Sequence, residues 1–169
     1  MSDVTHPKVS REEAIRDLAK RIKGIRFALL TTHGEGGRLL SRPMTTIEAE
    51  FDGELWFFTG ADTEVAREIQ THPEVNVAYT DNQSLWISVS GKAHVLRDEA
   101  KMQELWNPAV KAYFPDGLED PNLRLIRIDA EWAEYWDAPD SKLVQAFNIA
   151  KAVITGKRDK QGEHGEVEL

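Results

Sequence analysis

The residues best suited to chemistry lie close together in the first half of the chain. Arg42-Pro43-Met44 falls within one predicted strand, and Trp56-Phe57-Phe58-Thr59 falls within the next. Together the two segments give a cofactor-type signal. Pro43 removes one hydrogen bond from its strand. We therefore expect it at an edge or a bulge, where neighbouring backbone groups remain available to a ligand.

Each of these residues also has a simpler interpretation. A lone arginine such as Arg42 is more typical of a surface ion pair, and an aromatic run such as Trp56-Phe57-Phe58 is more typical of a core. The combination of the two segments with a short helix predicted to begin near Asp62 is what favours a cofactor site. For each residue taken singly, the sequence leaves both interpretations open.

Other kinds of chemistry leave no comparable pattern. The chain contains no cysteine, and its five histidines are scattered and fit no metal-binding spacing such as HExxH. A dinucleotide fingerprint, a P-loop and a GxSxG elbow are absent from the sequence as well. Gly34–Gly37 lies between two predicted strands, so we interpret it as a turn and not as a phosphate cradle. We predict no metal site, and catalytic residues stay unknown.

The composition is that of a globular protein with an acidic balance. Apolar residues make up 41% and charged residues 30% of the 169 residues, and the formal net charge is -8. This charge argues against binding to nucleic acid or to anionic membranes, since both require basic surfaces. The N-terminal residues lack an apolar signal segment, and no apolar run could span a bilayer, so we expect a cytoplasmic protein. We expect one domain over residues 1–155 and a polar, mobile tail over residues 156–169.

The elements that position the candidate residues are short strands and a few helices. Ser10 and Glu13 form a capping box for a first helix that ends at Gly24. Asp52-Gly53 is a strong hairpin signal, so we expect the strands on either side of it to pair. Gly91 interrupts an alternating strand and indicates a bulge. The expected strands cover residues 25–31, 39–51, 54–59, 75–79, 87–95 and 123–136, and the later helices begin near Asp62, Arg97 and Asp140 or Ser141.

This order of elements predicts an α+β or mainly β fold built on six antiparallel strands with flanking helices. Strands and helices do not alternate throughout, which argues against a doubly wound parallel sheet. Residues 25–31 are apolar on both faces, so we expect that strand to be buried.

Six segments carry a resemblance to a known family. They lie in a fixed order and spacing: SRPMT at 41–45, DGELWFFTGADTEVAREI at 52–69, ISVSG at 87–91, ELWNPAVKAYFPDG at 104–117, DPNLRLIRI at 120–128 and AEYWD at 133–137. Together they resemble the general stress protein branch of the pyridoxamine 5'-phosphate oxidase-like family, over about residues 10 to 155. The resemblance implies a six-stranded split β-barrel and a homodimer that holds FMN between its subunits.

The resemblance also implies roles for individual residues. Arg42 would face the flavin phosphate or the ring edge, and Pro43 and Met44 would pack on the ring. The phosphate side would be lined by Phe57, Phe58, Thr59 and Thr63, and Trp136 would approach the flavin from the other subunit.

One position departs from the family pattern. Val65 stands where the family usually has a lysine, and Glu64 adds an acid beside it. A flavin phosphate carries nearly two negative charges, so FAD instead of FMN, or loss of binding, stays open. Val65 also shares a helical face with Ile69, which is typical of a core residue.

Three functions are compatible with this sequence. The first is a flavin-dependent redox protein of the stress response, and the second is a flavin carrier or sensor without turnover. The third is a dimeric fold relative that binds another anionic ligand. The sequence names neither a substrate nor an electron donor.

Overall fold

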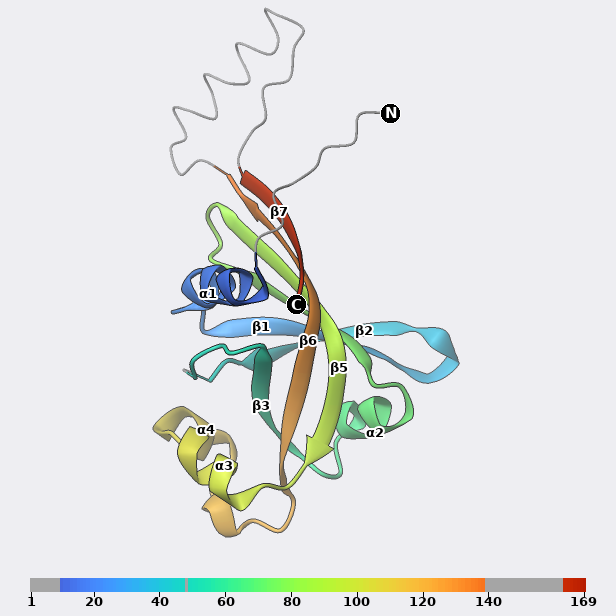
Figure 1. The fold of residues 1–169 in the computed structure, drawn as a ribbon. Helices are drawn as coiled ribbons and strands as arrows, with labels where there is room; N and C mark the ends of the chain where they lie inside the picture. The colour runs from blue at the N-terminus through green and yellow to red at the C-terminus, as the bar shows by residue number, and fades with distance from the viewer. Residues whose placement is uncertain (1–9, 48, 139–162) are drawn as a thin grey trace, which may run out of the picture.

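The protein folds around one curled antiparallel sheet with helices at its margins (Figure 1). The computed structural model describes residues 10–47, 49–138 and 163–169. Along the sheet the strands follow the order β2-β1-β4-β5-β6-β3, and β7 pairs with β6 beside this path. The fold predicted from the sequence, a six-stranded antiparallel split barrel of the α+β type, is confirmed. The strands are β1 Phe27–His33, β2 Leu39–Thr45, β3 Glu54–Gly60, β4 Glu74–Thr80, β5 Leu85–Leu96, β6 Leu123–Asp137 and β7 Glu163–Glu168.

The helices are short: α1 precedes β1, and the other three lie between strands along the chain. They are α1 Arg11–Ile22, α2 Glu64–Thr71, α3 Glu99–Leu105 and α4 Pro108–Tyr113. Helix α1 begins with the predicted capping box, in which Ser10 and Glu13 satisfy each other's backbone amides. Helix α4 was not predicted. It begins at Pro108, and Asn107 caps it by accepting hydrogen bonds from two backbone amides.

The predicted hairpin at Asp52-Gly53 is wrong. Strands β2 and β3 lie at opposite ends of the sheet, and β3 pairs along its whole length with β6. The turn itself forms, because Gly53 takes a φ of 110° and Asp52 accepts a hydrogen bond from the amide of Glu54. Its position does not join two paired strands, since β2 already ends at Thr45.

The predicted bulge at Gly91 is confirmed. The register between β5 and β6 shifts there, so that Ser90 pairs with Trp132 while Gly91 pairs with Ala130. A Cβ atom on Gly91 would lie 2.1 Å from the carbonyl oxygen of Asp129, so no larger residue fits without a backbone shift. Such a bulge increases the local twist of a strand pair. Both long strands are visibly curved in Figure 1.

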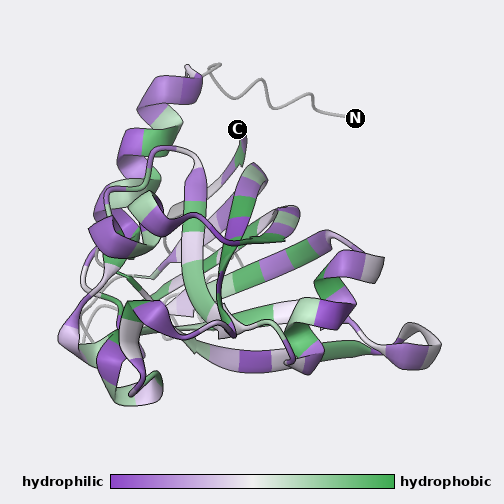
Figure 2. Ribbon diagram, turned by 90° about the horizontal axis from the view of Figure 1, so that it is seen from below, coloured by the Kyte–Doolittle hydropathy of each residue, from purple (hydrophilic) through white to green (hydrophobic). Residues whose placement is uncertain are grey.

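The core lies on the concave face of the sheet. Figure 2 shows apolar and polar residues alternating along several strands, as a sheet with one buried face requires. The inward side chains of β1, β3, β4, β5 and β6 pack with residues of α1 and α2. The largest contributors that are fully buried include Leu18, Leu30, Phe57, Ile69, Val77, Val89, Ile126 and Ile128.

The outer face of the sheet keeps large apolar side chains exposed. The exposed fraction is 58% for Phe27 and 47% for Leu29, so the prediction that residues 25–31 are buried on both faces is wrong. Trp86 and Trp136 pair across β5 and β6 on this same outer face and are also exposed. Single exposed apolar residues are common, but a set of them on one sheet face is typical of a binding surface.

The C-terminal residues depart from the expected tail. Residues 163–168 form β7, which pairs antiparallel with the end of β6 from Trp132 to Asp137. This strand was not expected from the sequence. The predicted helix from Asp140 or Ser141 lies outside the described residues.

Candidate functional site

A cavity of about 570 Å³ brings most of the predicted site together. Its walls are the ends of β2 and β3, the first turn of α2, and α4. Six of the eight predicted site residues line it: Arg42, Pro43, Met44, Phe58, Thr59 and Thr63. Its volume lies in the usual range of a small-molecule or cofactor site, roughly 300–1,000 Å³.

The hydroxyl groups of Thr59 and Thr63 line the cavity where β3 is followed by α2. The two oxygens lie 3.0 Å apart. Thr63 Oγ1 donates to the carbonyl of Gly60 over 2.8 Å, so Thr59 donates to Thr63. Thr63 also accepts from the amide of Ala66 and is thereby the N-cap of α2.

The prediction that Asp62 caps α2 is wrong, because the Asp62 side chain accepts a hydrogen bond from Asn122 instead. Asp62 Oδ1 accepts a hydrogen bond from Asn122 Nδ2 over 2.8 Å, and the Asp62 amide donates to Asn122 Oδ1 over 3.3 Å. The side chain therefore points toward the turn before β6 and away from the helix amides. The amides of Glu64 and Val65, the first two of α2, have no hydrogen-bond partner among the described residues. Such amides, together with the helix dipole, attract an anion.

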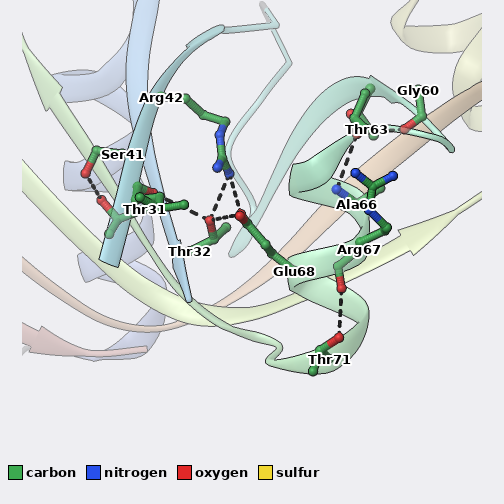
Figure 3. A network of polar contacts seen from close by, with 12 residues as sticks. Thr31, Thr32, Ser41, Arg42, Gly60, Thr63, Ala66, Arg67, Glu68 and Thr71 are labelled. Atoms are coloured by element: carbon green, nitrogen blue, oxygen red, sulfur yellow. Dashed lines mark hydrogen bonds and ion pairs between the residues drawn. The ribbon is translucent and has the colours of Figure 1, made fainter. Parts of the chain in front are cut away.

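Arg42 reaches the cavity from β2 but is held by an ion pair. Its Nη1 donates to Glu68 Oε2 and to Thr32 Oγ1, each over 2.8 Å, and Thr32 Oγ1 donates to the same Glu68 oxygen over 2.6 Å. Figure 3 shows the guanidinium directed at both partners, which come from β1 and α2. The two interpretations of Arg42 thus hold together: it forms an ion pair and it lines the cavity.

Glu68 is ionised within this network. Burial opposes ionisation, but hydrogen bonds from Arg42 and Thr32 outweigh it and lower the pKa of the Glu68 carboxyl from its usual range. Neither Glu68 nor Thr32 was among the predicted site residues. The sequence offered a weak signal for Glu68, which follows Val65 by three residues and so lies near the buried face of α2.

Pro43 occupies the kind of place predicted for it. Strand β2 ends the sheet and pairs only with β1, where Pro43 lies opposite Leu29. The other edge of β2 has no strand partner among the described residues. Its backbone groups near Met44 can therefore bind a ligand.

The two predicted phenylalanines point in opposite directions. Phe58 lines the cavity and packs edge-on against Trp106, with ring centroids 5.8 Å apart. Phe57 is fully buried in the main core, so its side chain does not reach the cavity. Alternation along β3 accounts for this difference.

Trp136 does not line the cavity of its own chain. It lies near the end of β6 and pairs there with Trp86 of β5. Leu123, at the beginning of β6, pairs with Gly60 at the cavity.

Val65 belongs both to the core and to the cavity wall. Its exposed fraction is 6%, and it packs in the same cluster as Ile69. The interpretation of Val65 as a core residue is confirmed. The charged residues that line the cavity are Arg42, Asp62 and Glu64, so with Glu68 beside Arg42 the acids outnumber the cation.

A larger cavity of about 740 Å³ lies next to this one and shares Thr45, Ile47 and Tyr113 with it. It contains none of the predicted site residues. Among the described residues there is no cluster of three or more metal-binding side chains, and no helix is long and apolar enough to cross a membrane.

Comparison with known proteins decides the family. The model of pyridoxamine 5'-phosphate oxidase-like proteins matches residues 13–160. The chain belongs to the pyridoxamine 5'-phosphate oxidase-like family. The expected family membership is therefore confirmed over nearly the whole chain.

Individual proteins resemble the chain over most of their own length. A general stress FMN/FAD binding protein of Xanthomonas citri is 35% identical, with a TM-score of 0.66 over 76% of this chain and 92% of that one. General stress protein 26 of Bacillus anthracis is 24% identical, with a TM-score of 0.64 over 72% of this chain and 92% of that one. Protein bli-3 of Neurospora crassa is 29% identical over 161 residues, which cover 89% of this chain and 77% of that protein. The two bacterial stress proteins thus share the fold of this chain, and the Xanthomonas citri protein also shares about a third of its sequence.

Proposed function

We propose that this protein binds a flavin nucleotide, FMN or alternatively FAD, in the 570 Å³ cavity and acts as a redox protein of the stress response. The observation that carries the proposal is the convergence of Arg42, the Thr59–Thr63 hydroxyl pair and the unpartnered amides of α2 on this one cavity. The FMN/FAD binding of the Xanthomonas citri relative supports the same ligand class.

The phosphate end of the ligand belongs at the start of α2. Thr59 and Thr63 present hydroxyl groups there, and the amides of Glu64 and Val65 point out of the helix terminus. Oxygen atoms of a phosphate accept from such groups, and the dipole of the helix favours the negative charge. Asp62 and Glu64 are exposed and oppose the negative charge of the phosphate groups of FMN and FAD alike.

The ring end belongs along β2. The unpaired edge of this strand offers backbone hydrogen-bonding groups to the polar edge of an isoalloxazine. Arg42 can donate to a ring or phosphate oxygen, and Met44 and Phe58 give apolar surfaces for packing. These residues fit a planar cofactor with one charged end.

We also propose that a second copy of the chain completes the site in a homodimer. The outer face of the sheet exposes Phe27, Leu29, Trp86, Trp132 and Trp136, and a two-fold partner would cover them. The same arrangement would bring Trp136 of one chain to the cavity of the other. Light scattering should give a mass of about twice 19.1 kDa, and a monomer with bound flavin would contradict the shared site.

Bound flavin would supply electron transfer, while the protein would bind and orient it and limit its contact with water. A carrier or sensor without turnover is the competing function. Rapid reduction of the bound flavin by a nicotinamide nucleotide, followed by turnover with an acceptor, distinguishes the redox protein from the carrier.

The binding proposal is tested by spectral titration of the purified protein with FMN, FAD and pyridoxal 5'-phosphate in turn. We expect saturable flavin binding with a shifted absorption spectrum. Arg42→Met should weaken it about tenfold or more, since a hydrogen bond from a charged group contributes roughly 1.5–3 kcal/mol.

Arg38→Met is the matched control for this variant. Arg38 is exposed and does not line the cavity, so its loss should leave flavin affinity unchanged. Failure of every flavin to bind the unaltered protein would overturn the proposed function. Equal effects of the two arginine variants would overturn the placement of the ligand.

A further inference from the structure

The most enclosed polar cluster beside the cavity joins three elements. Thr32 from β1 is fully buried, Arg42 comes from β2 and Glu68 from α2. The exposed fractions of the Arg42 and Glu68 side chains are 24% and 13%. The cluster therefore connects two walls of the cavity, β2 and α2 (Figure 3).

These contacts use only one of the three guanidinium nitrogens of Arg42. Both of its hydrogen bonds to described residues come from Nη1, so Nε and Nη2 make none within the described part of the chain. Neither Nε nor Nη2 is among the buried polar atoms that lack a hydrogen-bond partner. Both nitrogens are therefore accessible from the cavity or from solvent. A guanidinium has a rigid planar fork, and holding one nitrogen restricts the directions in which the others can donate.

We infer that Glu68, together with Thr32, is a positioning residue that holds Arg42 in the orientation in which it binds the flavin. The inference rests on the proposed function. Glu68 fixes Nη1, and Nε or Nη2 then donates to the ligand. Because the arginine side chain is already ordered in the folded protein, its loss of rotamer entropy does not oppose binding. This pre-organisation increases the affinity for the ligand.

Simple charge reasoning predicts the opposite effect for Glu68. The flavin nucleotide is anionic, so an acid near it should weaken binding, and removal of the acid should strengthen it. Positioning predicts weaker binding after removal, because Arg42 is no longer held. The sign of the change therefore distinguishes the two roles.

The experiment measures FMN and FAD affinity for Glu68→Gln and for a control on the same helix, Glu64→Gln. Glu64 lines the cavity, is exposed and makes no contact with Arg42, so its neutralisation should tighten binding up to about threefold. Glu68→Gln should weaken binding about three- to tenfold. Thr32→Val should weaken it similarly, whereas Thr32→Ser, which keeps the hydroxyl, should restore it.

A double-mutant cycle provides a readout that a purely structural role would not change. In an Arg42→Met background, Glu68→Gln should no longer weaken binding, because there is no arginine left to position. Tighter or unchanged binding in Glu68→Gln alone would overturn the inference while leaving the proposed function intact. Equal weakening with and without Arg42 would also overturn it. If the unaltered protein bound no flavin, that result would refute the proposed function and therefore also this inference.

Discussion

Val65→Lys tests how this chain differs from its family at the phosphate end of the cavity. Val65 is the second residue of α2, and its side chain packs with Ile69 while also forming part of the cavity wall. The family resemblance places a lysine here. A lysine could extend from this position into the cavity, but only by removing an apolar side chain from the core.

The structure gives a magnitude for each consequence. Val65 is 6% exposed, and burial of a valine contributes about 1.5–3 kcal/mol. The lysine stem keeps part of that contact, so the unfolding free energy should fall by about 1–3 kcal/mol. For a chain of this length, such a loss lowers the melting temperature by roughly 2–12 °C. The ammonium should strengthen FMN binding by about 1 kcal/mol, or roughly fivefold, at low salt.

The assay combines thermal melting without ligand and FMN titration at low and high salt. Val65→Met is the matched control, because it has an unbranched apolar stem of similar length and no charge. The affinity gain should occur only for lysine and should shrink with salt, since it is Coulombic. An unchanged melting temperature would refute the core placement of Val65. A lower melting temperature without tighter binding would refute the placement of the phosphate at the start of α2.

Three further predictions concern the scaffold of the site. Gly91→Ala should lower the unfolding free energy by about 3 kcal/mol or more, as measured by denaturant titration, because the added Cβ would lie 2.1 Å from a carbonyl oxygen of β6. A variant as stable as the unaltered protein would show that the bulge is absent. The depressed pKa of Glu68 implies stability that is present above pH 4.5 and lost as the pH falls through the folded pKa. The stability difference between the unaltered protein and Glu68→Gln should therefore disappear in acid, and a difference that persists there would contradict the ion pair with Arg42. Asp81→Ala should lower the unfolding free energy by about 1 kcal/mol, as measured by thermal melting, because Asp81 Oδ1 accepts hydrogen bonds from the amides of Leu85, Gln83 and Ser84. An unchanged melting temperature would show that other contacts order this turn.

Features that depend on neighbouring residues could be predicted from the sequence. The capping box at Ser10 and the bulge at Gly91 are local, because each follows from residue types and a short spacing. Arg42 and the Thr59–Thr63 pair could be assigned to one site because the family resemblance supplied their association. Period-two alternation along β3 would have separated Phe57 from Phe58 once the strand's buried face was known.

Features that depend on distant partners could not be predicted. The partner of β3 is β6, more than 60 residues later in the chain, and no local signal outweighed the Asp52-Gly53 turn. Strand β7 is highly polar and pairs through its backbone at the end of β6, so its composition indicated a mobile tail. The contact between Arg42 and Glu68 requires β2 and α2 to be adjacent, which only the folded sheet establishes.

The most direct test of the central claim is a crystal structure of the protein grown with FMN. We predict a homodimer with flavin in the cavity of each chain, the phosphate at Thr59, Thr63 and the first amides of α2, and the ring along Arg42-Pro43-Met44. We also predict that Trp136 of the partner subunit closes the site. Flavin bound elsewhere, such as in the neighbouring 740 Å³ cavity, or a complete site within a single chain, would contradict the account.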